Sequence, residues 1–219
     1  MLERVLEPEV MDSPEEARDY DAMDHTAVNR VFVVDFLAAW TGKGTILDVG
    51  TGTAQIPIEL CRHSPTAEVI AIDMAEHMLA TGRTNVCQAG LEKRITLRLE
   101  DAKRLSFAAG RFAAVISNSI VHHIPDPGPV LTEMVRVLQP GATLFVRDLL
   151  RPRSTDELAR LVAAYAGAAN AHQQQMFADS LHAALNLAEI RDLVARLDFD
   201  AGEVRQTSDR HWTWFARKK

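Results

Sequence analysis

The stretch TILDVGTGTAQ, residues 45–55, combines three local patterns that belong to one structural unit. Residues 45–49 are mostly apolar, as in a short strand that is buried in a parallel sheet. Gly50 and Gly52 predict a tight turn after this strand, and residues 54–63 are expected to continue as a helix. Because a strand, a glycine turn and a helix N-terminus in succession allow close approach to the backbone, we expect a ligand to bind at this turn.

Two classes of cofactor use such a turn, and the neighbouring residues distinguish them. A dinucleotide fingerprint requires Gly or Ala at its last position, where this chain has Gln55. Asp48 lies two places before Gly50, near the end of the strand. This arrangement resembles motif I of the class I S-adenosylmethionine (SAM) methyltransferases, with the usual third glycine of the family replaced by Ala54. The single methyl group of Ala54 at a helix start is expected to leave the fold intact.

Strands and helices continue to alternate after this stretch. Further strands are expected at residues 67–72, 95–99, 111–117 and 142–146, and helices at residues 75–89 and from Pro129 onward. The alternation predicts an α/β fold with a doubly wound, mostly parallel sheet. Residues 203–206 and 211–216 are expected to form an antiparallel C-terminal hairpin that completes a seven-stranded sheet, with Trp212 and Trp214 on one face in the core.

The segments before and after these strands have helical patterns. Ser13-Pro14 predicts a helix start, and the pattern continues to about Trp40. Further helices are expected at residues 154–169, 176–185 and 186–197. We expect a lid over the acceptor, formed by the helices after the fifth strand and by residues 13–35 with their polar group Tyr20, Asp21 and His25. The expected organisation is one domain with an N-terminal helical cap (1–40), a SAM-binding Rossmann-like core (41–151), a helical insertion or lid (152–198) and the C-terminal hairpin (199–219).

Composition and charge limit the classes of partner. The chain has 219 residues and a net charge of −6 at pH 7, which disfavours a nucleic-acid substrate because phosphates attract basic surfaces. Its two cysteines, Cys61 and Cys87, lie in expected helices and do not indicate a disulfide framework. The N-terminus carries no cationic leader, and no apolar run approaches the roughly 18 residues of a membrane span. We therefore expect a cytoplasmic monomer or homodimer without a membrane or nucleic-acid partner.

Polar side chains stand at or just beyond the ends of the five expected parallel strands: Asp48, Asp73, Asp101, Asn118 and Asp148. In doubly wound sheets, ligands bind beyond the carboxyl ends of the strands. Asp73 follows the glycines at the spacing of an acid that accepts hydrogen bonds from a ribose diol, a feature that NAD and SAM sites share. The strand ends therefore predict a nucleoside-binding site along one edge of the sheet.

Residues 45–151 resemble a class I SAM-dependent methyltransferase of the type found in ubiquinone biosynthesis and small-molecule methylation. The runs that carry this resemblance are ILDVGTGTA, VIAIDMAEHML, LEDAKRLSF and FAAVISNSIVHHIPDPGPVLTEMVRVLQPGATLFVRD. The resemblance implies SAM as the cofactor and S-adenosyl-L-homocysteine as the product. The cofactor-binding residues that it implies are Asp48, Gly50, Thr51 and Gly52 at the methionine moiety, Asp73 at the ribose, Met74, Asp101 and Ala102 at the adenine, and Ser117 and Asn118 near the sulfonium.

The chemistry of the acceptor is less specified. A sulfonium methyl group is already activated, so the protein needs mainly to hold a nucleophile in line with it, although a hydroxyl gains from a general base. Of the adjacent His122 and His123, the second matches the apolar-His-His pattern of the family and is the preferred catalytic residue, with Asp148 and Tyr20. A structural role for His123 and a helix-capping role for Asp148 are the alternatives. No metal is expected, because adjacent histidines are poorly placed to bind one ion together.

The sequence thus favours a methyltransferase that transfers a methyl group to a small molecule by in-line displacement. The acceptor atom, whether O, N, S or C, stays open. The alternatives are a SAM-binding protein with a sensing role or other chemistry, and an RNA or protein methyltransferase. A dehydrogenase is disfavoured by Gln55.

Overall fold

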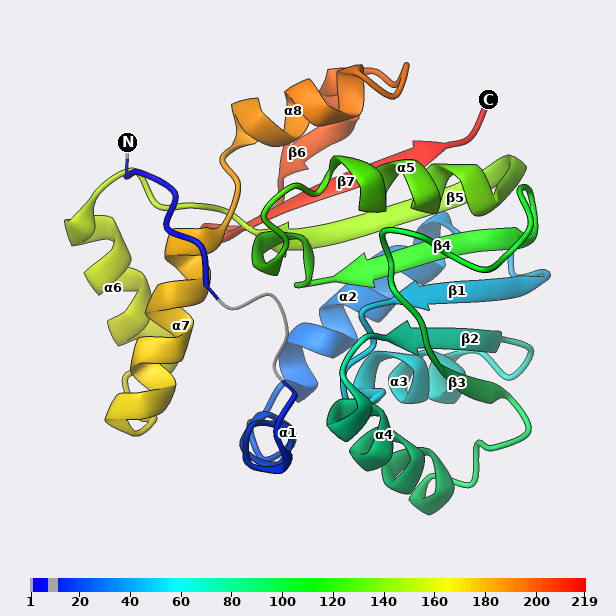
Figure 1. Ribbon diagram of the computed structural model, residues 1–219, viewed down its shortest axis with the longest axis horizontal. Coiled ribbons are helices and arrows are strands. Elements are labelled where there is room, and N and C mark those ends of the chain that lie inside the picture. Colours follow the sequence, from blue (N-terminus) through cyan, green and yellow to red (C-terminus); the bar gives the residue numbers. More distant parts are fainter. Residues whose placement is uncertain (1, 8–11) are drawn as a thin grey trace. The chain divides into compact units, whose positions relative to one another are not determined.

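The strands of the computed structural model, which describes residues 2–7 and 12–219, form one sheet of seven strands (Figure 1). They are β1 (Thr45–Val49), β2 (Glu68–Asp73), β3 (Ile95–Leu99), β4 (Phe112–Asn118), β5 (Leu138–Leu149), β6 (Val204–Gln206) and β7 (His211–Arg217). The strand order is β3-β2-β1-β4-β5-β7-β6. β1 pairs in parallel with β2 and β4, β2 pairs in parallel with β3, and β6 pairs with β7 in antiparallel fashion. The predicted mostly parallel sheet with an antiparallel C-terminal hairpin is confirmed.

Helices separate the first five strands, except that a loop joins β3 to β4, and three helices follow one another after β5. The helices are α1 (Pro14–Asp21), α2 (Thr26–Ala39), α3 (Gln55–His63), α4 (Glu76–Gln88), α5 (Gly128–Val137), α6 (Thr155–Ala166), α7 (Ala171–Ala183) and α8 (Leu187–Ala195), with short 3-10 turns η1 (Val121–His123) and η2 (Ala201–Glu203). No helix within residues 2–7 and 12–219 is both long enough and apolar enough to cross a bilayer.

One compact unit of the chain contains β1 to β4 and the helices α1 to α5. Its described residues are 12–118, 128–146 and 215–219. The side chains of β1 are buried from Ile46 onward, as expected for a strand with parallel neighbours on both sides. Phe32 and Phe36 of α2 are fully buried, and both pack edge-on against Phe145 of β5. This aromatic contact fixes α2 on the sheet.

The other compact unit comprises residues 2–7, 119–127 and 147–214. Here α6 and α7 lie side by side around a small apolar core that includes Leu161 and Leu181 (Figure 1). Trp212 and Trp214 of β7 are both fully buried, which confirms their predicted place in the core. Phe199 packs edge-on against the ring of Trp214.

Two helix boundaries differ from the expectation. The N-terminal helical pattern is divided into α1 and α2, because the carboxylate of Asp24 accepts a hydrogen bond from the backbone N–H of Thr26 (3.0 Å) and starts a second helix. The predicted start of α1 is confirmed, since Ser13 and Glu16 form a reciprocal capping box. α7 begins before the expected residue 176 because Asn170 caps it, so the polar residues that follow form its first turn.

Candidate functional site

The glycine turn after β1 is held by hydrogen bonds from its own backbone. Gly50 and Thr51 both donate to the carbonyl oxygen of Ile72 (2.9 Å each), and Gly52 donates to Oδ2 of Asp73 (2.7 Å). Gly50 and Gly52 have positive φ angles of 76° and 55°, which a glycine adopts without steric cost. Oδ1 of Asp73 accepts from the backbone N–H of Ala75 (2.9 Å) at the start of α4. The carboxylate of Asp73 therefore joins the turn to the next helix.

Ala54 occupies a strained backbone position. Its φ angle is 66°, in the left-handed region, where a residue with a Cβ is disfavoured by roughly 1–2 kcal/mol. Its side chain is fully buried in the core of the unit. The fold accommodates alanine here, as expected, but the backbone angle supplies a physical reason for a glycine at this position.

Two buried carboxyl or carboxamide oxygen atoms near the turn lack a hydrogen bond of good geometry from the described residues. They are Oδ2 of Asp48, a side chain that is 2% exposed, and Oδ1 of Asn118 at the end of β4. Burial raises the pKa of Asp48 to about 7; the hydroxyl of Thr51 opposes this shift, and the negative charge of Asp73 adds to it. An unsatisfied buried acceptor is costly, so both atoms are suited to a donor on a ligand. The ammonium group in the methionine moiety of SAM is such a donor, and the residues present fit SAM in this respect.

The other predicted cofactor residues differ in how available they are. Ser117 is buried and its hydroxyl donates to the carbonyl oxygen of Val49 (2.8 Å), so this side chain already has a partner in the neighbouring strand. Met74 is 38% exposed after the end of β2. Asp101 is exposed, and its Oδ1 accepts from the backbone N–H of Lys103 (2.9 Å). Met74 and Asp101 are thus open to a ligand, whereas the hydroxyl of Ser117 supports the sheet.

Tyr20 of α1 lies over the glycine turn. Its side chain packs with Ala17, Ala75 and Met78, and its Cε1 lies 3.5 Å from the position that a Cβ on Gly52 would occupy. Burial raises the pKa of Tyr20 to about 12, and nearby carboxylates add to the shift. The phenol is therefore protonated at neutral pH and can donate a hydrogen bond, but it is not a general base there.

The polar residues of the N-terminal helices contact α3 and α4. Oδ1 of Asp21 accepts from the side-chain amides of Gln55 (3.2 Å) and Asn85 (2.8 Å), and Oε1 of Gln55 accepts from Asn29 (3.2 Å). This network gives Gln55 a structural role at the start of α3. The expectation that residues 13–35 cover an acceptor stays a prediction.

The histidines after β4 form a second cluster, in the unit that contains α6 to α8. His122 is buried, and its Nδ1 lies 2.6 Å from Oδ1 of Asp148. The same carboxylate accepts from the backbone N–H groups of Val121 and Leu149 (2.6 Å each). Asp148 therefore orients His122 and not His123, the predicted catalytic residue.

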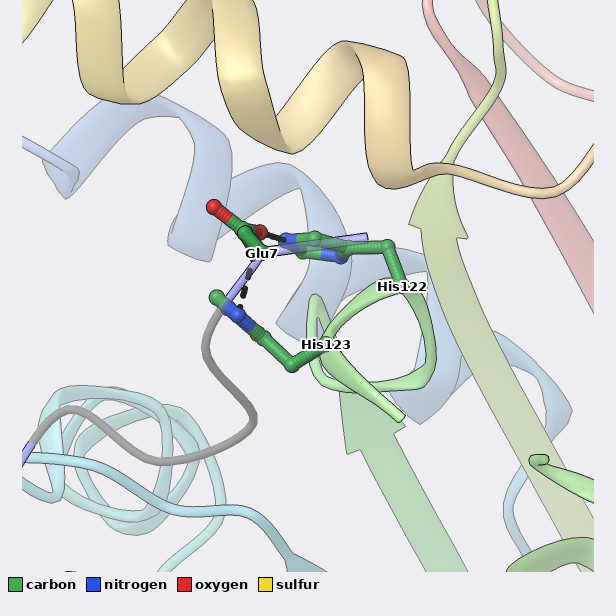
Figure 2. A group of neighbouring side chains, drawn as sticks. All are labelled: Glu7, His122 and His123. Carbon is green, nitrogen blue, oxygen red and sulfur yellow. Dashed lines mark ion pairs between the residues drawn. The ribbon is translucent and has the colours of Figure 1, made fainter. Parts of the chain in front are cut away.

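Glu7 completes this cluster and was not found from the sequence. Its Oε1 lies 3.1 Å from Nδ1 of His123 and 3.5 Å from Nε2 of His122, and both rings face it (Figure 2). Burial disfavours the imidazolium of His122, but the charges of Asp148 and Glu7 outweigh this and raise its pKa. Burial likewise disfavours the carboxylate of Glu7, yet the two histidines lower its pKa below the ordinary value.

The two histidines converge, contrary to the reason given for expecting no metal. Their ring centroids are 4.1 Å apart, because the 3-10 turn η1 brings both imidazoles to the same carboxylate. Glu7, His122 and His123 offer ligand atoms that all lie within 4.8 Å of one another. Adjacency in the sequence therefore does not prevent His122 and His123 from facing one ion.

Arg4 fixes the segment that carries Glu7. Its guanidinium donates to the backbone carbonyl oxygens of His122 (3.2 Å), Ile124 (3.0 Å), Pro125 (3.1 Å) and Ala183 (2.7 Å). The backbone N–H of Val5 adds a bond to the carbonyl oxygen of His182 (3.2 Å). Residues 2–7 are thereby held against η1 and the end of α7, a contact between segments that no local sequence pattern indicates.

The segment that contains the glycine turn is similar to known methyltransferases. Residues 46–141 match the model of the methyltransferase domain family. A ubiquinone/menaquinone biosynthesis C-methyltransferase of Geobacter sulfurreducens is 31% identical over 116 residues, which are 52% of this chain and 45% of that protein. This chain spans about half the length of the curated relatives that it matches.

Two solved structures share the fold. A SAM-dependent methyltransferase from Aquifex aeolicus has a TM-score of 0.68 at 18% identity, over 95% of this chain and all of that chain (100%). The plantazolicin methyltransferase BpumL, solved in complex with S-adenosylhomocysteine, has a TM-score of 0.71 at 15% identity, over 94% of this chain and 89% of that chain. Residues 46–141 therefore match the methyltransferase domain family, and the resemblance of this segment to the class I SAM-dependent methyltransferases is confirmed.

Proposed function

We propose that this chain is a SAM-dependent methyltransferase that acts on a small molecule. The observation that carries the proposal is the pair of unsatisfied buried acceptors, Oδ2 of Asp48 and Oδ1 of Asn118, beside a glycine turn that Asp73 holds. Both acceptors lie at the carboxyl ends of parallel strands in a methyltransferase domain, where a ligand is expected.

In this proposal the residues of the glycine turn bind the cofactor. Asp48 accepts from the ammonium group of SAM. Met74 contacts the adenine. The carboxylate of Asp101 accepts a hydrogen bond from the adenine amino group, and Ala102 lies beside that group. The cofactor supplies an activated methyl group, and the protein aligns an acceptor with it.

Similar proteins support a small molecule as the acceptor, but they do not identify the atom that receives the methyl group. The relative from Geobacter sulfurreducens is named for methylation at carbon in quinone biosynthesis, and BpumL is named for plantazolicin. These names favour a small-molecule acceptor for this chain but leave open whether O, N, S or C receives the methyl group. A cytoplasmic location and a monomeric or dimeric state stay predictions.

The catalytic trio of His123, Asp148 and Tyr20 also stays a prediction, and the contacts refine it. Asp148 is a positioning residue, because its carboxylate holds His122. Tyr20 acts as a hydrogen-bond donor, because its pKa of about 12 keeps the phenol protonated. His123, with 21% of its side chain exposed, is the more accessible histidine of the cluster.

The test begins with native mass spectrometry of the purified chain for bound SAM or S-adenosylhomocysteine. Labelled SAM is then offered with a panel of phenols, quinols, amines and thiols. Asp73→Asn should bind SAM at least about 10-fold more weakly, because charge-assisted hydrogen bonds are lost. Asp192→Asn, at an exposed position of α8, should bind SAM like the wild type.

Binding of NAD in preference to SAM would contradict the proposal. Tight SAM binding without transfer to any small molecule, peptide or RNA in the panel would favour the alternative of a SAM-binding protein with a sensing role or other chemistry. Transfer to RNA or peptide alone would replace the small-molecule acceptor.

A further inference from the structure

We propose that Glu7, His122 and His123 form a binding site for a divalent transition-metal ion. The three side chains come from two segments far apart in the sequence, residues 2–7 and the turn η1, and their ligand atoms converge (Figure 2). The site lies within one compact unit of the chain, and the proposal does not depend on methyl transfer.

The distances suit one small ion. A tetrahedral zinc ion with bonds of about 2.1 Å holds its ligand atoms about 3.4 Å apart. Oε1 of Glu7 lies 3.1 Å from Nδ1 of His123 and 3.5 Å from Nε2 of His122. All three atoms lie within 4.8 Å of one another, so a small rotation of one ring brings the set around an ion.

Asp148 prepares His122 for coordination. Its Oδ1 lies 2.6 Å from Nδ1 of His122, which holds a proton on that nitrogen, so that an ion that displaces the second proton meets the lone pair of Nε2 on the side of Glu7. A carboxylate that holds the second nitrogen of a ligating histidine is the usual outer partner in metal sites. Asp148 also accepts from the backbone of Val121 and Leu149, so its own position is fixed.

Two atoms of the cluster contact each other at 3.1 Å without forming a well-aligned hydrogen bond. Oε1 of Glu7 and Nδ1 of His123 are both buried, and neither has a hydrogen-bond partner of acceptable geometry in the part of the chain that the structure describes. The other oxygen of Glu7 accepts from the hydroxyl of Ser180 (3.4 Å). A bound cation would satisfy the oxygen and the nitrogen together, which an ion pair without good hydrogen-bond geometry does only in part.

The segment that carries Glu7 is held in place before any ion binds. Four hydrogen bonds from Arg4 and one from the backbone of Val5 tie residues 2–7 to η1 and α7. Metal sites with preorganised ligands bind more tightly, because less ordering is needed on binding.

The donor set selects the class of ion. Two imidazole nitrogens and one carboxylate oxygen suit Zn²⁺, Fe²⁺, Co²⁺ or Ni²⁺, whereas Mg²⁺ and Ca²⁺ prefer oxygen ligands. Three protein ligands leave at least one coordination position for water, as in sites where the ion acts as a Lewis acid.

The experiment titrates Zn²⁺ into the untagged full chain after dialysis against a chelator, by calorimetry and by elemental analysis. The wild type should bind one ion per chain. Glu7→Gln and His123→Gln should each raise the dissociation constant at least about 10-fold, as the loss of even an outer partner does. His172→Gln is the matched control, because His172 is an exposed histidine at the start of α7 and should bind Zn²⁺ like the wild type.

A second measurement needs no variant. Binding of Zn²⁺ should shift the imidazole signals of His122 and His123 in the NMR spectrum and leave that of His172 in place. No uptake of Zn²⁺, Co²⁺ or Ni²⁺ by the wild type would overturn the proposal, and so would equal uptake by His123→Gln or a shift confined to exposed histidines.

Discussion

Replacing Asp48 by asparagine tests whether the buried carboxyl group at the end of β1 is retained for a cationic ligand. Asp48 is 2% exposed, and its Oδ2 has no hydrogen bond of good geometry in the described part of the chain. Burial raises its pKa to about 7, the nearby charge of Asp73 adds to this, and Tyr20 faces the same carboxylates without a charge of its own. Asparagine has nearly the same shape but is neutral at every pH, so the variant removes the charge and replaces one acceptor oxygen by an amide donor.

The raised pKa has a defined effect on stability. The folded chain binds the proton of Asp48 up to a pH of about 7, whereas the unfolded chain releases it near the ordinary value of 3.8. The contribution of Asp48 to stability is therefore full below about pH 4, falls as the pH rises to about 7 and is constant above that. The difference of about three pKa units corresponds to roughly 4 kcal/mol.

The amide of the variant brings a donor that also needs a partner, at a cost of about 1–3 kcal/mol. We therefore expect Asp48→Asn to be more stable than the wild type by about 1–3 kcal/mol at pH 8, and equally or less stable at pH 4. Urea unfolding at the two pH values measures this difference.

The affinity for SAM should favour the wild type over Asp48→Asn and should rise with pH. The carboxylate that accepts from the ammonium group becomes about tenfold rarer for each pH unit below 7, so the affinity of the wild type should fall about tenfold per unit there. Asp48→Asn should bind SAM more weakly, with an affinity that does not follow this slope. Calorimetry at about pH 6, 7 and 8 would refute the reasoning if the two proteins bound SAM equally well, or if the wild type showed no slope.

Three further predictions concern single residues. Tyr20→Phe should lower the methyl-transfer rate by about 2- to 10-fold without changing the shape of the pH–rate profile below pH 9, because a phenol with a pKa of about 12 does not titrate there; a new pH dependence would contradict this. Ala54→Gly should change the free energy of unfolding by less than about 1 kcal/mol, because relief of the positive φ angle is offset by the loss of a buried methyl group and by a more flexible unfolded chain. Ala54→Val should lower the free energy of unfolding by more than about 2 kcal/mol, as measured by thermal or urea unfolding. Burial and the charge of Arg210 lower the pKa of His211 to about 4, so this residue should remove roughly 3 kcal/mol of stability as the pH falls from about 6.5 to 4; in urea unfolding, the stability of His211→Gln relative to the wild type should therefore rise over this range, and a constant difference would contradict this.

The sheet was predictable because its signals are local. The apolar run of β1, the glycines that follow it and the acid at the end of β2 lie within one βαβ unit, and short-range rules connect them. The start of α1 at Ser13 and of α8 at Asn186 follows from side chains that cap their own helix. The division between α1 and α2 is not predicted because the hydrogen bond from the backbone N–H of Thr26 to the carboxylate of Asp24 interrupts an otherwise continuous helical pattern.

The histidine cluster was not predictable from such rules. Glu7 lies more than 100 residues before His122 in the sequence. Its segment is held by hydrogen bonds from Arg4 to backbone carbonyl oxygens, and no sequence pattern marks these acceptors because every residue has a carbonyl group. The choice between His122 and His123 as the partner of Asp148 depends on how a single 3-10 turn directs two adjacent rings. Residue order alone does not contain that information.

Asp48 and Asp148 illustrate the same limit in one residue type. Each stands one residue before the last residue of its strand, β1 and β5 respectively, and each is almost completely buried. The Oδ2 of Asp48 has no hydrogen bond of good geometry in the described chain, and the pKa of Asp48 rises to about 7. Burial also disfavours the carboxylate of Asp148, but His122 and two backbone N–H groups donate to it and lower its pKa. The sequence gives both positions the same side chain; the donors that fold around it make one carboxylate a fixed support and leave the other for a ligand.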